Sequence, residues 1–293
     1  MKVKEILKDY AQGGLAEALG SCDNHILEGA REIRIRQGLP LIIRGFGGET
    51  VLPYKPTMQD IGGALEKMAD HSLYAFDAEI KNGFITLPRG HRVGICGRVV
   101  LEGGKIKTLR HISGLTIRVA RQVLGAADEV LPLVKNADKI HNTLIISPPG
   151  QGKTTVLRDL VRQLSNLGKH VSVVDERSEI AGSCQGIAQN DLGQRTDVLD
   201  GAPKAEGMLL MLRAMSPDVI AVDEIGGPDD VAALLSIASC GAKIIATLHG
   251  ENMADLQRKQ SLAPLLDNKI FDKYIFLTDK PTPGTLREVV ECF

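Results

Sequence analysis

Residues 144–155 read LIISPPGQGKTT, an apolar run that breaks into a turn rich in proline and glycine. This change from strand to loop to helix is what a phosphate-binding loop needs, because its backbone N–H groups close on phosphate oxygens. A lysine then reaches the β and γ phosphates and a hydroxyl holds Mg²⁺, while the helix adds its positive N-terminal end. We prefer this interpretation to a chance turn. It assigns nucleotide binding to Ser147, Pro148, Pro149, Gly150, Gln151, Gly152, Lys153, Thr154 and Thr155, and Mg²⁺ binding also to Thr154.

The loop departs from the pattern G-x-x-x-x-G-K-[ST] at its first position, where Ser147 replaces glycine. Serine also forms tight turns, and the Pro148, Pro149 and Gly150 that follow disfavour a helix or a strand. A nucleotide site is therefore expected despite the substitution.

A second apolar run ends in two carboxylates. Residues 219–222 are apolar without alternation, which predicts a strand buried on both faces of a parallel sheet, and Asp223 and Glu224 follow directly. Carboxylates at this end of a strand emerge where open α/β sheets bind ligands. Asp223 is suited to holding Mg²⁺, and Glu224 to orienting or deprotonating the attacking water. The alternative is that the pair only caps the next helix.

Two further strand ends carry polar side chains. Asp175 and Glu176 follow the strand expected at 170–175, where they either position water or metal or are tied up by Arg177 in a surface turn. His249 follows the strand expected at 243–247. It either contacts a γ-phosphate or is a histidine satisfied at a helix start.

The length of 293 residues indicates two domains. The N-terminus lacks the features of a signal peptide, and no apolar stretch approaches the roughly 20 residues that span a bilayer. The five scattered cysteines indicate reduced thiols in a cytoplasm. The formal net charge of −1 gives no general attraction to nucleic acid, so none is expected as a partner.

Residues 1–138 are predicted to form an α+β domain. EIRIR and LPLIIR indicate strands, Thr57 is a possible N-cap of a helix to about residue 70, and a short helix is expected to end near Gly83. The segment 89–121 alternates polar and apolar residues around a Gly-Gly pair and holds eight basic residues against the single acid Glu102. It predicts a basic β-hairpin.

From residue 139 to 293, apolar strands alternate with helices, which is typical of a parallel α/β sheet. Strands are predicted at 143–147, 170–175, 219–223, 243–247 and 274–278, with a closing antiparallel strand at 285–290. Helices are predicted at 152–167, 205–215, 229–240 and 253–261. The segment 182–200 shows neither period and is predicted to be a loop.

The order of phosphate loop, VVDERSE, LRAMSPDVIAVDEIGG and ATLHG resembles the secretion-type ATPases of type II and type IV secretion and pilus machines. Within that superfamily, SLYAFDAEIKNGFITLPRGHRVGICGRVV, NDLGQRTDVLDGAPKAEGMLLMLRAMSPDVI and VDEIGGPDD resemble more closely the stage III sporulation AA family of endospore-forming bacteria. This resemblance covers the chain from about residue 30 onward.

The resemblance implies a RecA-like P-loop NTPase core with a smaller N-terminal α+β domain. It further implies an ATPase that uses ATP and Mg²⁺ and works as a hexameric ring, a homo-oligomer that drives motion at a membrane-embedded assembly. For the sporulation family that assembly is the channel between mother cell and forespore. The ATPase would then lie in the cytoplasm, peripheral to the membrane on the mother-cell side, with sporulation channel proteins as partners.

The resemblance also implies roles for individual residues, according to their positions in the motifs. Lys153 and Thr154 match the Walker A motif, Asp223 and Glu224 the Walker B motif, Asp175, Glu176 and Glu179 the Asp box, and His249 the His box. The chain differs from secretion ATPases in having Asp223 where they usually have glycine, and its His box is shorter. Which carboxylate activates water therefore stays open, with Glu224 preferred over Glu176.

The basic hairpin offers candidate catalytic arginines. A ring built head to tail places an arginine of one subunit at the γ-phosphate of the next, where it stabilises charge that develops during phosphoryl transfer. Arg110, Arg118 and Arg121 are the candidates, with Arg98 behind them. The alternative is a basic strand face that is only solvated.

Two other function classes are open. One is a RecA-like nucleic-acid motor, which the scarcity of aromatic residues argues against because bases stack on such side chains. The other is a nucleotide-gated scaffold that binds ATP but hydrolyses it weakly. Kinase activity is not expected, because no second substrate pocket is apparent.

Overall fold

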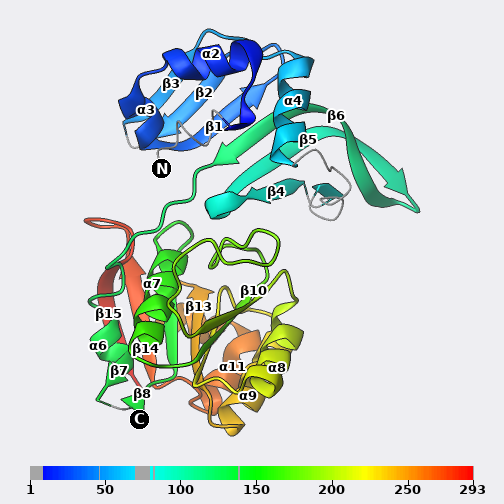
Figure 1. The fold of residues 1–293 in the computed structure, drawn as a ribbon. Coiled ribbons are helices and arrows are strands. Elements are labelled where there is room, and N and C mark those ends of the chain that lie inside the picture. Colours follow the sequence, from blue (N-terminus) through cyan, green and yellow to red (C-terminus); the bar gives the residue numbers. More distant parts are fainter. Residues whose placement is uncertain (1–8, 46, 70–79, 82, 138, 293) are drawn as a thin grey trace. The chain divides into compact units, whose positions relative to one another are not determined.

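The structure is a computed structural model that describes residues 9–45, 47–69, 80–81, 83–137 and 139–292. The chain forms two compact units, Met1–Arg121 and Gln122–Phe293 (Figure 1). Residues 122–137, which were predicted from the sequence to belong to the first domain, pack with the second unit. Ala127, Val130 and Val134 belong to its core, and the Ala127 N–H donates to the buried carboxylate of Asp159 at 3.0 Å.

The second unit is built on a seven-stranded sheet. Its strands in spatial order are β11 (Thr196–Asp200), β10 (Val171–Asp175), β12 (Val219–Val222), β13 (Lys243–His249), β9 (Thr143–Ser147), β14 (Lys273–Thr278) and β15 (Thr285–Glu291). Neighbouring strands are parallel, except that β15 runs antiparallel to β14. The predicted α/β class and the closing antiparallel strand are confirmed.

Continuous apolar strands arise because both faces of this sheet are covered. Leu144 and Ile146 of β9 belong to one core cluster and Ile145, between them, to another. The first face packs under α8 (Lys204–Met215), α9 (Pro228–Ser239), α10 (Met253–Arg258) and α11 (Ala263–Asp267), and the second under α7 (Lys153–Asn166). Smaller elements are α6 (Leu131–Val134), β7 (Lys135–Asn136), β8 (Lys139–Ile140) and η3 (Gln260–Leu262).

The prediction of a loop over 182–200 is wrong at its end. Strand β11 occupies Thr196–Asp200 and pairs with β10 residue for residue. Its residues are all half-buried, and Val198 and Leu199 pack on opposite faces. Apolar and polar residues alternate over too few positions in this edge strand to give a clear hydrophobic pattern in the sequence.

The first unit contains a six-stranded antiparallel sheet. Its strands in spatial order are β3 (Gly48–Leu52), β2 (Leu41–Gly45), β1 (Ala30–Arg36), β6 (Lys105–Arg118), β5 (His91–Glu102) and β4 (Phe84–Leu87). The helices of this unit that lie wholly within the described residues are α2 (Gly13–Ser21), α3 (Asn24–Gly29), α4 (Met58–Met68) and η2 (Pro88–Gly90). The helix expected before Gly83 lies largely outside the described residues.

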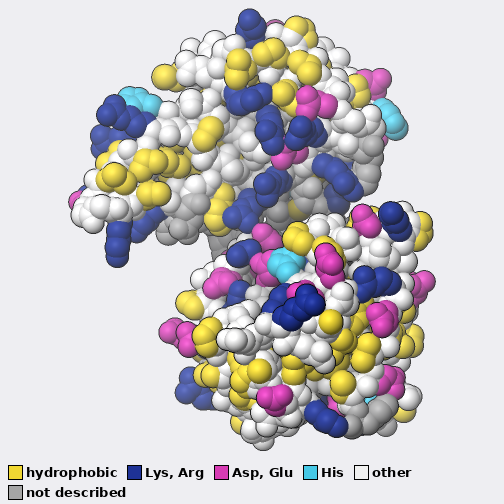
Figure 2. All heavy atoms as spheres, turned by 180° about the vertical axis from the view of Figure 1, so that it is seen from behind, with side chains coloured by type: hydrophobic (Ala, Val, Ile, Leu, Met, Phe, Trp, Pro, Cys, Tyr) yellow, Lys and Arg dark blue, Asp and Glu magenta, His cyan; other side chains and the backbone are white. Residues whose placement is uncertain are grey.

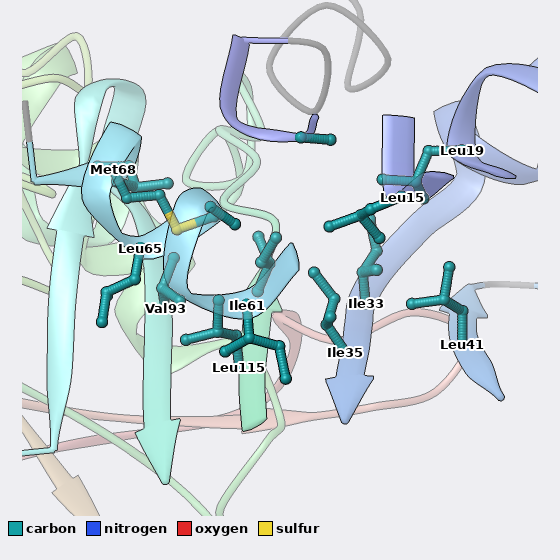
Figure 3. Packing of buried hydrophobic residues seen from close by; sticks show 14 of the residues in the cluster. Leu15, Leu19, Ile33, Ile35, Leu41, Ile61, Leu65, Met68, Val93 and Leu115 are labelled. Carbon is teal, nitrogen blue, oxygen red and sulfur yellow. The ribbon is translucent and has the colours of Figure 1, made fainter. Parts of the chain in front are cut away.

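The predicted helix after Thr57 is confirmed as α4, with a capping box at its start. The Thr57 hydroxyl accepts from the Asp60 N–H at 3.2 Å, and the Asp60 carboxylate accepts from the Thr57 N–H at 2.8 Å. Figure 3 shows how the unit is held together: Ile61 and Leu65 of α4 lie with buried residues of the strands, such as Val93.

The basic hairpin is also confirmed. Strands β5 and β6 turn at Gly103 and Gly104, whose φ angles of 58° and 78° favour glycine. Strand β1 pairs with β6 only as far as Gly114 and β4 pairs with β5 only as far as Gly94, so the rest of the hairpin extends beyond the sheet (Figure 1). In Figure 2 this end of the first unit shows hydrophobic and basic side chains together. The exposed apolar residues there are Val99, Leu101 and Ile106.

In the part of the chain that the structure describes, every helix is too short or too polar to cross a bilayer.

Candidate active site

The polar residues singled out in the second unit meet at the carboxyl ends of its parallel strands. Ser147 ends β9 and stands opposite His249 of β13 in the ladder. Asp175 ends β10, and Asp223 directly follows β12, which pairs with β10. Parallel pairing therefore brings these segments to one edge, where the loop after β9 leads into α7.

Backbone conformation explains the glycines of the phosphate loop. Gly150 and Gly152 have φ angles of 76° and 89°, which other residues adopt only with strain. A side chain at Gly152 would also collide with the turn after β14, because its Cβ would lie 2.6 Å from the nitrogen of Gly284. The Gly284 N–H donates to the Gln151 carbonyl at 3.0 Å, so this turn stabilises the phosphate loop.

Ser147 fits because glycine is not required where it stands. It is the last residue of β9, it is buried, and its φ angle is not positive. Its hydroxyl donates to the Pro148 carbonyl at 3.0 Å. The departure from the usual pattern thus leaves the turn intact.

Lys153, the first residue of α7, folds back over the loop. Its ammonium donates to the carbonyls of Ser147 and Pro148 at 2.8 and 3.0 Å and lies 3.0 Å from Nδ1 of His249. Burial lowers the pKa of Lys153, against the opposing charges of Asp223 and Glu224. Because the amine donates to two uncharged backbone carbonyls, a phosphate offers it a stronger partner. Thr155 lies in the same first turn of α7.

Thr154, Asp223 and Thr247 form a hydroxyl–carboxylate–hydroxyl chain. The Thr154 hydroxyl donates to one oxygen of Asp223 at 2.6 Å, and the buried Thr247 hydroxyl donates to the other. A hydroxyl and a carboxylate at this separation are oxygen ligands of the kind that Mg²⁺ takes beside nucleotide phosphates. The two residues predicted to hold the metal are thus adjacent and fit it. Among the described residues, no cluster of three or more His, Cys, Asp or Glu suits a metal ion.

Glu224 is held between two basic side chains. Its carboxylate contacts Nε2 of His249 on one side and Nη1 of Arg177 on the other, at 2.7 Å to the arginine. Burial alone would raise the pKa of Glu224, but the His249 hydrogen bond and the charges of His249 and Arg177 lower it below its usual value. A carboxylate this acidic is ionised at neutral pH and suited to orienting a water. Its φ of 56° marks a strained position.

The two acidic residues at the end of β10, Asp175 and Glu176, have different surroundings. Asp175 is buried and accepts from the N–H groups of Glu179, Ile180 and Ala181 at 2.8 to 3.0 Å, so it organises the following loop. Glu176 pairs with Lys204 at 2.9 Å. A small pocket is lined by Glu176 together with Asp175, Arg177, Glu179, Asp223 and Glu224, among others. Both Asp175 and Glu176 thus line this pocket beside Asp223 and Glu224, but the Asp175 carboxylate is already engaged by three backbone N–H groups.

The burial of Asp175 predicts a pH dependence of stability. Burial raises its pKa to about 6, although the N–H groups of Ala181, Glu179 and Ile180 oppose the rise. Because the folded state then binds this proton more tightly than the unfolded chain, stability falls as pH rises from about 4 to about 6. We expect a loss of up to about 3 kcal/mol across this window, on the scale of 1.36 kcal/mol per pKa unit.

Urea unfolding of the whole chain between pH 4 and 7 measures this effect, with Asp175→Asn as the comparison. The variant lacks the titrating group, so its unfolding free energy should change less across the window. Equal pH profiles for the two proteins would contradict the assignment.

Thr247 was not anticipated from the sequence. Besides contacting Asp223, its hydroxyl accepts from the Glu224 N–H at 2.9 Å, so one side chain positions both Walker B residues. We expect Thr247→Val, which keeps the shape and loses the hydroxyl, to lower ATP turnover by roughly 10-fold or more, since two buried hydrogen bonds are lost. Thr247→Ser should restore most of the turnover. Steady-state kinetics at saturating ATP test this, and equal rates for the Val and Ser variants would show that the hydroxyl is irrelevant.

Two more contacts around the His249 segment also escaped prediction. Lys259 donates to the His249 carbonyl, and Arg287 to the Glu251 carbonyl. Lys259 directly follows α10 and Arg287 lies on β15, and no motif in the sequence marks either of them.

The candidate arginines lie in the first unit. Arg110 and Arg118 are exposed on β6, where they stand opposite Arg98 and Arg92 respectively in the ladder with β5. Arg121 donates to the carbonyls of Glu28 and Ala30, at 3.1 Å to the latter, and so ties the chain to the end of α3. Two of the three candidates are thus displayed on the surface of their own unit, and the third is engaged within it.

Known proteins match both the whole chain and its fold. The family model described as "Sporulation stage III, protein AA" matches residues 3–292. Stage III sporulation protein AA of Bacillus subtilis (strain 168) is 41% identical over 296 residues, which cover 99% of this chain and 94% of that protein.

Solved structures agree on the fold. The pilus retraction motor PilT with bound ADP aligns with a TM-score of 0.60 and 19% identity, covering 94% of this chain and 78% of that one. The Legionella pneumophila ATPase DotB aligns with a TM-score of 0.56 and 17% identity, covering 84% and 72%. The predicted RecA-like fold of the core is confirmed.

Proposed function

The chain belongs to the sporulation stage III protein AA family, and from this premise we propose that it is an ATPase that works as the motor of a ring. The observation that carries the proposal is the meeting of Lys153, Thr154, Asp223 and Glu224 at one edge of the sheet. Lysine, hydroxyl, metal-binding carboxylate and water-orienting carboxylate are the parts that phosphoryl transfer from a nucleotide requires.

Each residue has a distinct task in this mechanism. The loop N–H groups and the Lys153 ammonium bind the β and γ phosphates, for which Lys153 leaves the carbonyls that hold it in the free protein. Thr154 and Asp223 would hold Mg²⁺, which would supply neutralising charge at the phosphate oxygens. Glu224 orients the attacking water, and His249, between Lys153 and Glu224, links the phosphate-binding amine to the water-orienting carboxylate. Glu176 is a second candidate for the water.

The assembly and its place in the cell are also part of the proposal. We infer a homo-oligomeric, hexameric ring in which the first unit meets the nucleotide of a neighbouring subunit. Membership of the sporulation family supports a role at the channel between mother cell and forespore, with the protein in the mother-cell cytoplasm, peripheral to the membrane, and membrane-embedded channel proteins as partners. The mass of the particle with and without Mg-ATP tests the ring, and a persistent monomer at high concentration contradicts it.

Binding of ATP itself is tested with Lys153→Ala. We expect the variant to bind Mg-ATP about 100-fold more weakly than the parent, because charge-assisted hydrogen bonds of about 1.5–3 kcal/mol each are lost. Isothermal titration calorimetry measures the change, and Lys55→Ala, an exposed lysine of the first unit, is the control. If the folded parent takes up no adenine nucleotide, the proposed function is wrong.

A further inference from the structure

A second cationic pocket lies at the amino ends of the parallel strands, the end opposite to the candidate active site. Ladder pairs join Val171 to Val219 and Val219 to Lys243, so the starts of β10, β12 and β13 lie side by side. The cavity at this end has a volume of about 720 Å³. Residues of the nucleotide site do not line it, so it is a separate feature of the fold.

Positive charge dominates the pocket wall. Lys139, Lys169, Arg213 and Lys243 line it, with Asp218 as the only acid among the lining residues. None of the four cations forms an ion pair in the described part of the chain, and Asp218 already accepts from the His170 N–H at 2.8 Å. The C-terminal ends of α8 and α9 add about half a negative charge each, which with Asp218 leaves a net charge of about +2. Since the whole chain carries a formal net charge of −1, the pocket is a local concentration of positive charge.

Regular structure fixes the backbone of Lys169 and Lys243 and holds the Arg213 side chain against its own helix. The Lys243 N–H donates to the Asp218 carbonyl at 2.9 Å, the Lys169 N–H to the Leu164 carbonyl at 3.2 Å, and Arg213 Nε to the Leu209 carbonyl of its own helix at 3.1 Å. Leu212, Pro217 and Ala242 provide apolar surface between them. The contact of the Arg213 side chain with its own helix partly orders this cation before a ligand binds, which lowers part of the ordering cost.

We propose that this pocket binds a phosphate-bearing anion. Ammonium groups bind phosphate oxygens as point charges and the guanidinium fork of Arg213 adds two parallel donors. The volume lies within the range of about 300–1,000 Å³ that small-molecule sites occupy, which suits a diphosphate or a phosphorylated headgroup. The same chemistry is supplied by a soluble phosphate ester or by the headgroup of a phospholipid.

Two exposed cysteines allow a direct test with pyrophosphate. Cys240 lines the pocket, and Cys96, in the first unit, does not. We use the full chain with Lys153→Ala, so that the phosphate loop does not compete, and measure alkylation of each cysteine by peptide mass spectrometry. Pyrophosphate is expected to slow alkylation of Cys240 at least fivefold and to leave Cys96 unchanged, against sodium chloride of equal ionic strength. The combined change Lys169→Gln and Lys243→Gln should raise the half-protecting concentration about 10-fold or more, as loss of about 1.4 kcal/mol requires.

Vesicles distinguish the two sources of the anion. A lipid headgroup is identified if the protein sediments with phosphatidylglycerol vesicles but not with phosphatidylcholine vesicles. The Lys169/Lys243 variant should then no longer sediment with the phosphatidylglycerol vesicles. Protection by pyrophosphate without vesicle binding identifies a soluble phosphate ester. The proposal is overturned if neither probe binds, or if the variant responds to both as the parent does. Equal melting temperatures of parent and variant show that the comparison is between folded proteins.

Discussion

Glu224→Gln is expected to lower the rate of ATP hydrolysis by about 10²-fold or more while leaving ATP binding within a few-fold of the parent. Glutamine has the same shape but no charge, so it orients and polarises the attacking water less well. It does not remove Lys153, Thr154 or Asp223, which bind the phosphates and the metal in the proposed mechanism. Single-turnover hydrolysis, with enzyme in excess over ATP, measures the chemical step without product release.

The size of this effect also separates a motor from a nucleotide-gated scaffold. In the free protein the Glu224 carboxylate is engaged by Arg177 and His249, and it must be released toward the water for fast hydrolysis. A scaffold that hydrolyses ATP poorly would show little difference between parent and Glu224→Gln. Glu206→Gln, an exposed glutamate in the first turn of α8, is the matched control and should change neither rate nor affinity. If Glu176→Gln rather than Glu224→Gln abolishes hydrolysis, the roles of the two carboxylates are exchanged.

Most of the second unit could be predicted from the sequence, because its strands are buried on both faces. Such strands are continuous apolar runs, and polar residues at their ends mark the edge where ligands bind. The expected strands and helices of this unit agree with the structure to within a few residues. The edge strand Thr196–Asp200 was missed because half-buried residues carry no such run. In the first unit, the mostly exposed strand Gly48–Leu52 escaped for a similar reason, whereas Phe84–Leu87 is largely buried but only four residues long.

The details of the site were less predictable because they depend on which way side chains turn. Thr247 is a β-branched residue inside a strand, where threonine is common for packing reasons alone. Its contact with Asp223 exists only because two strands, far apart in the chain, are neighbours in the sheet. Asp175 shows the opposite case: its place at a strand end suggested the active face, whereas its carboxylate turns into the N–H groups of residues 179–181.

The arginines of the first unit carry the second large expected effect. If one of them reaches the nucleotide of a neighbouring subunit, replacing it with alanine should lower turnover by about 10³-fold, the lower end of the effect of such arginines, with little loss of ATP affinity. Arg110 and Arg118 are the better placed, since both are exposed on β6. Arg121→Ala instead removes contacts to the Glu28 and Ala30 carbonyls, so we expect it to lower the stability of the first unit.

Mixing two inactive variants shows whether the arginine acts between subunits. A subunit with Glu224→Gln keeps its arginines, and a subunit with Arg110→Ala or Arg118→Ala keeps its Glu224. In a mixed ring about one interface in four combines both intact groups, so mixing should restore activity to about a quarter of the parent's. An arginine that acts within its own subunit gives no rescue. The proposal is contradicted if turnover is unchanged when each arginine is replaced in turn, that is, Arg98, Arg110, Arg118 and Arg121. The hairpin would then be only a solvated basic surface, and an arginine that completes the site would have to come from another part of the chain.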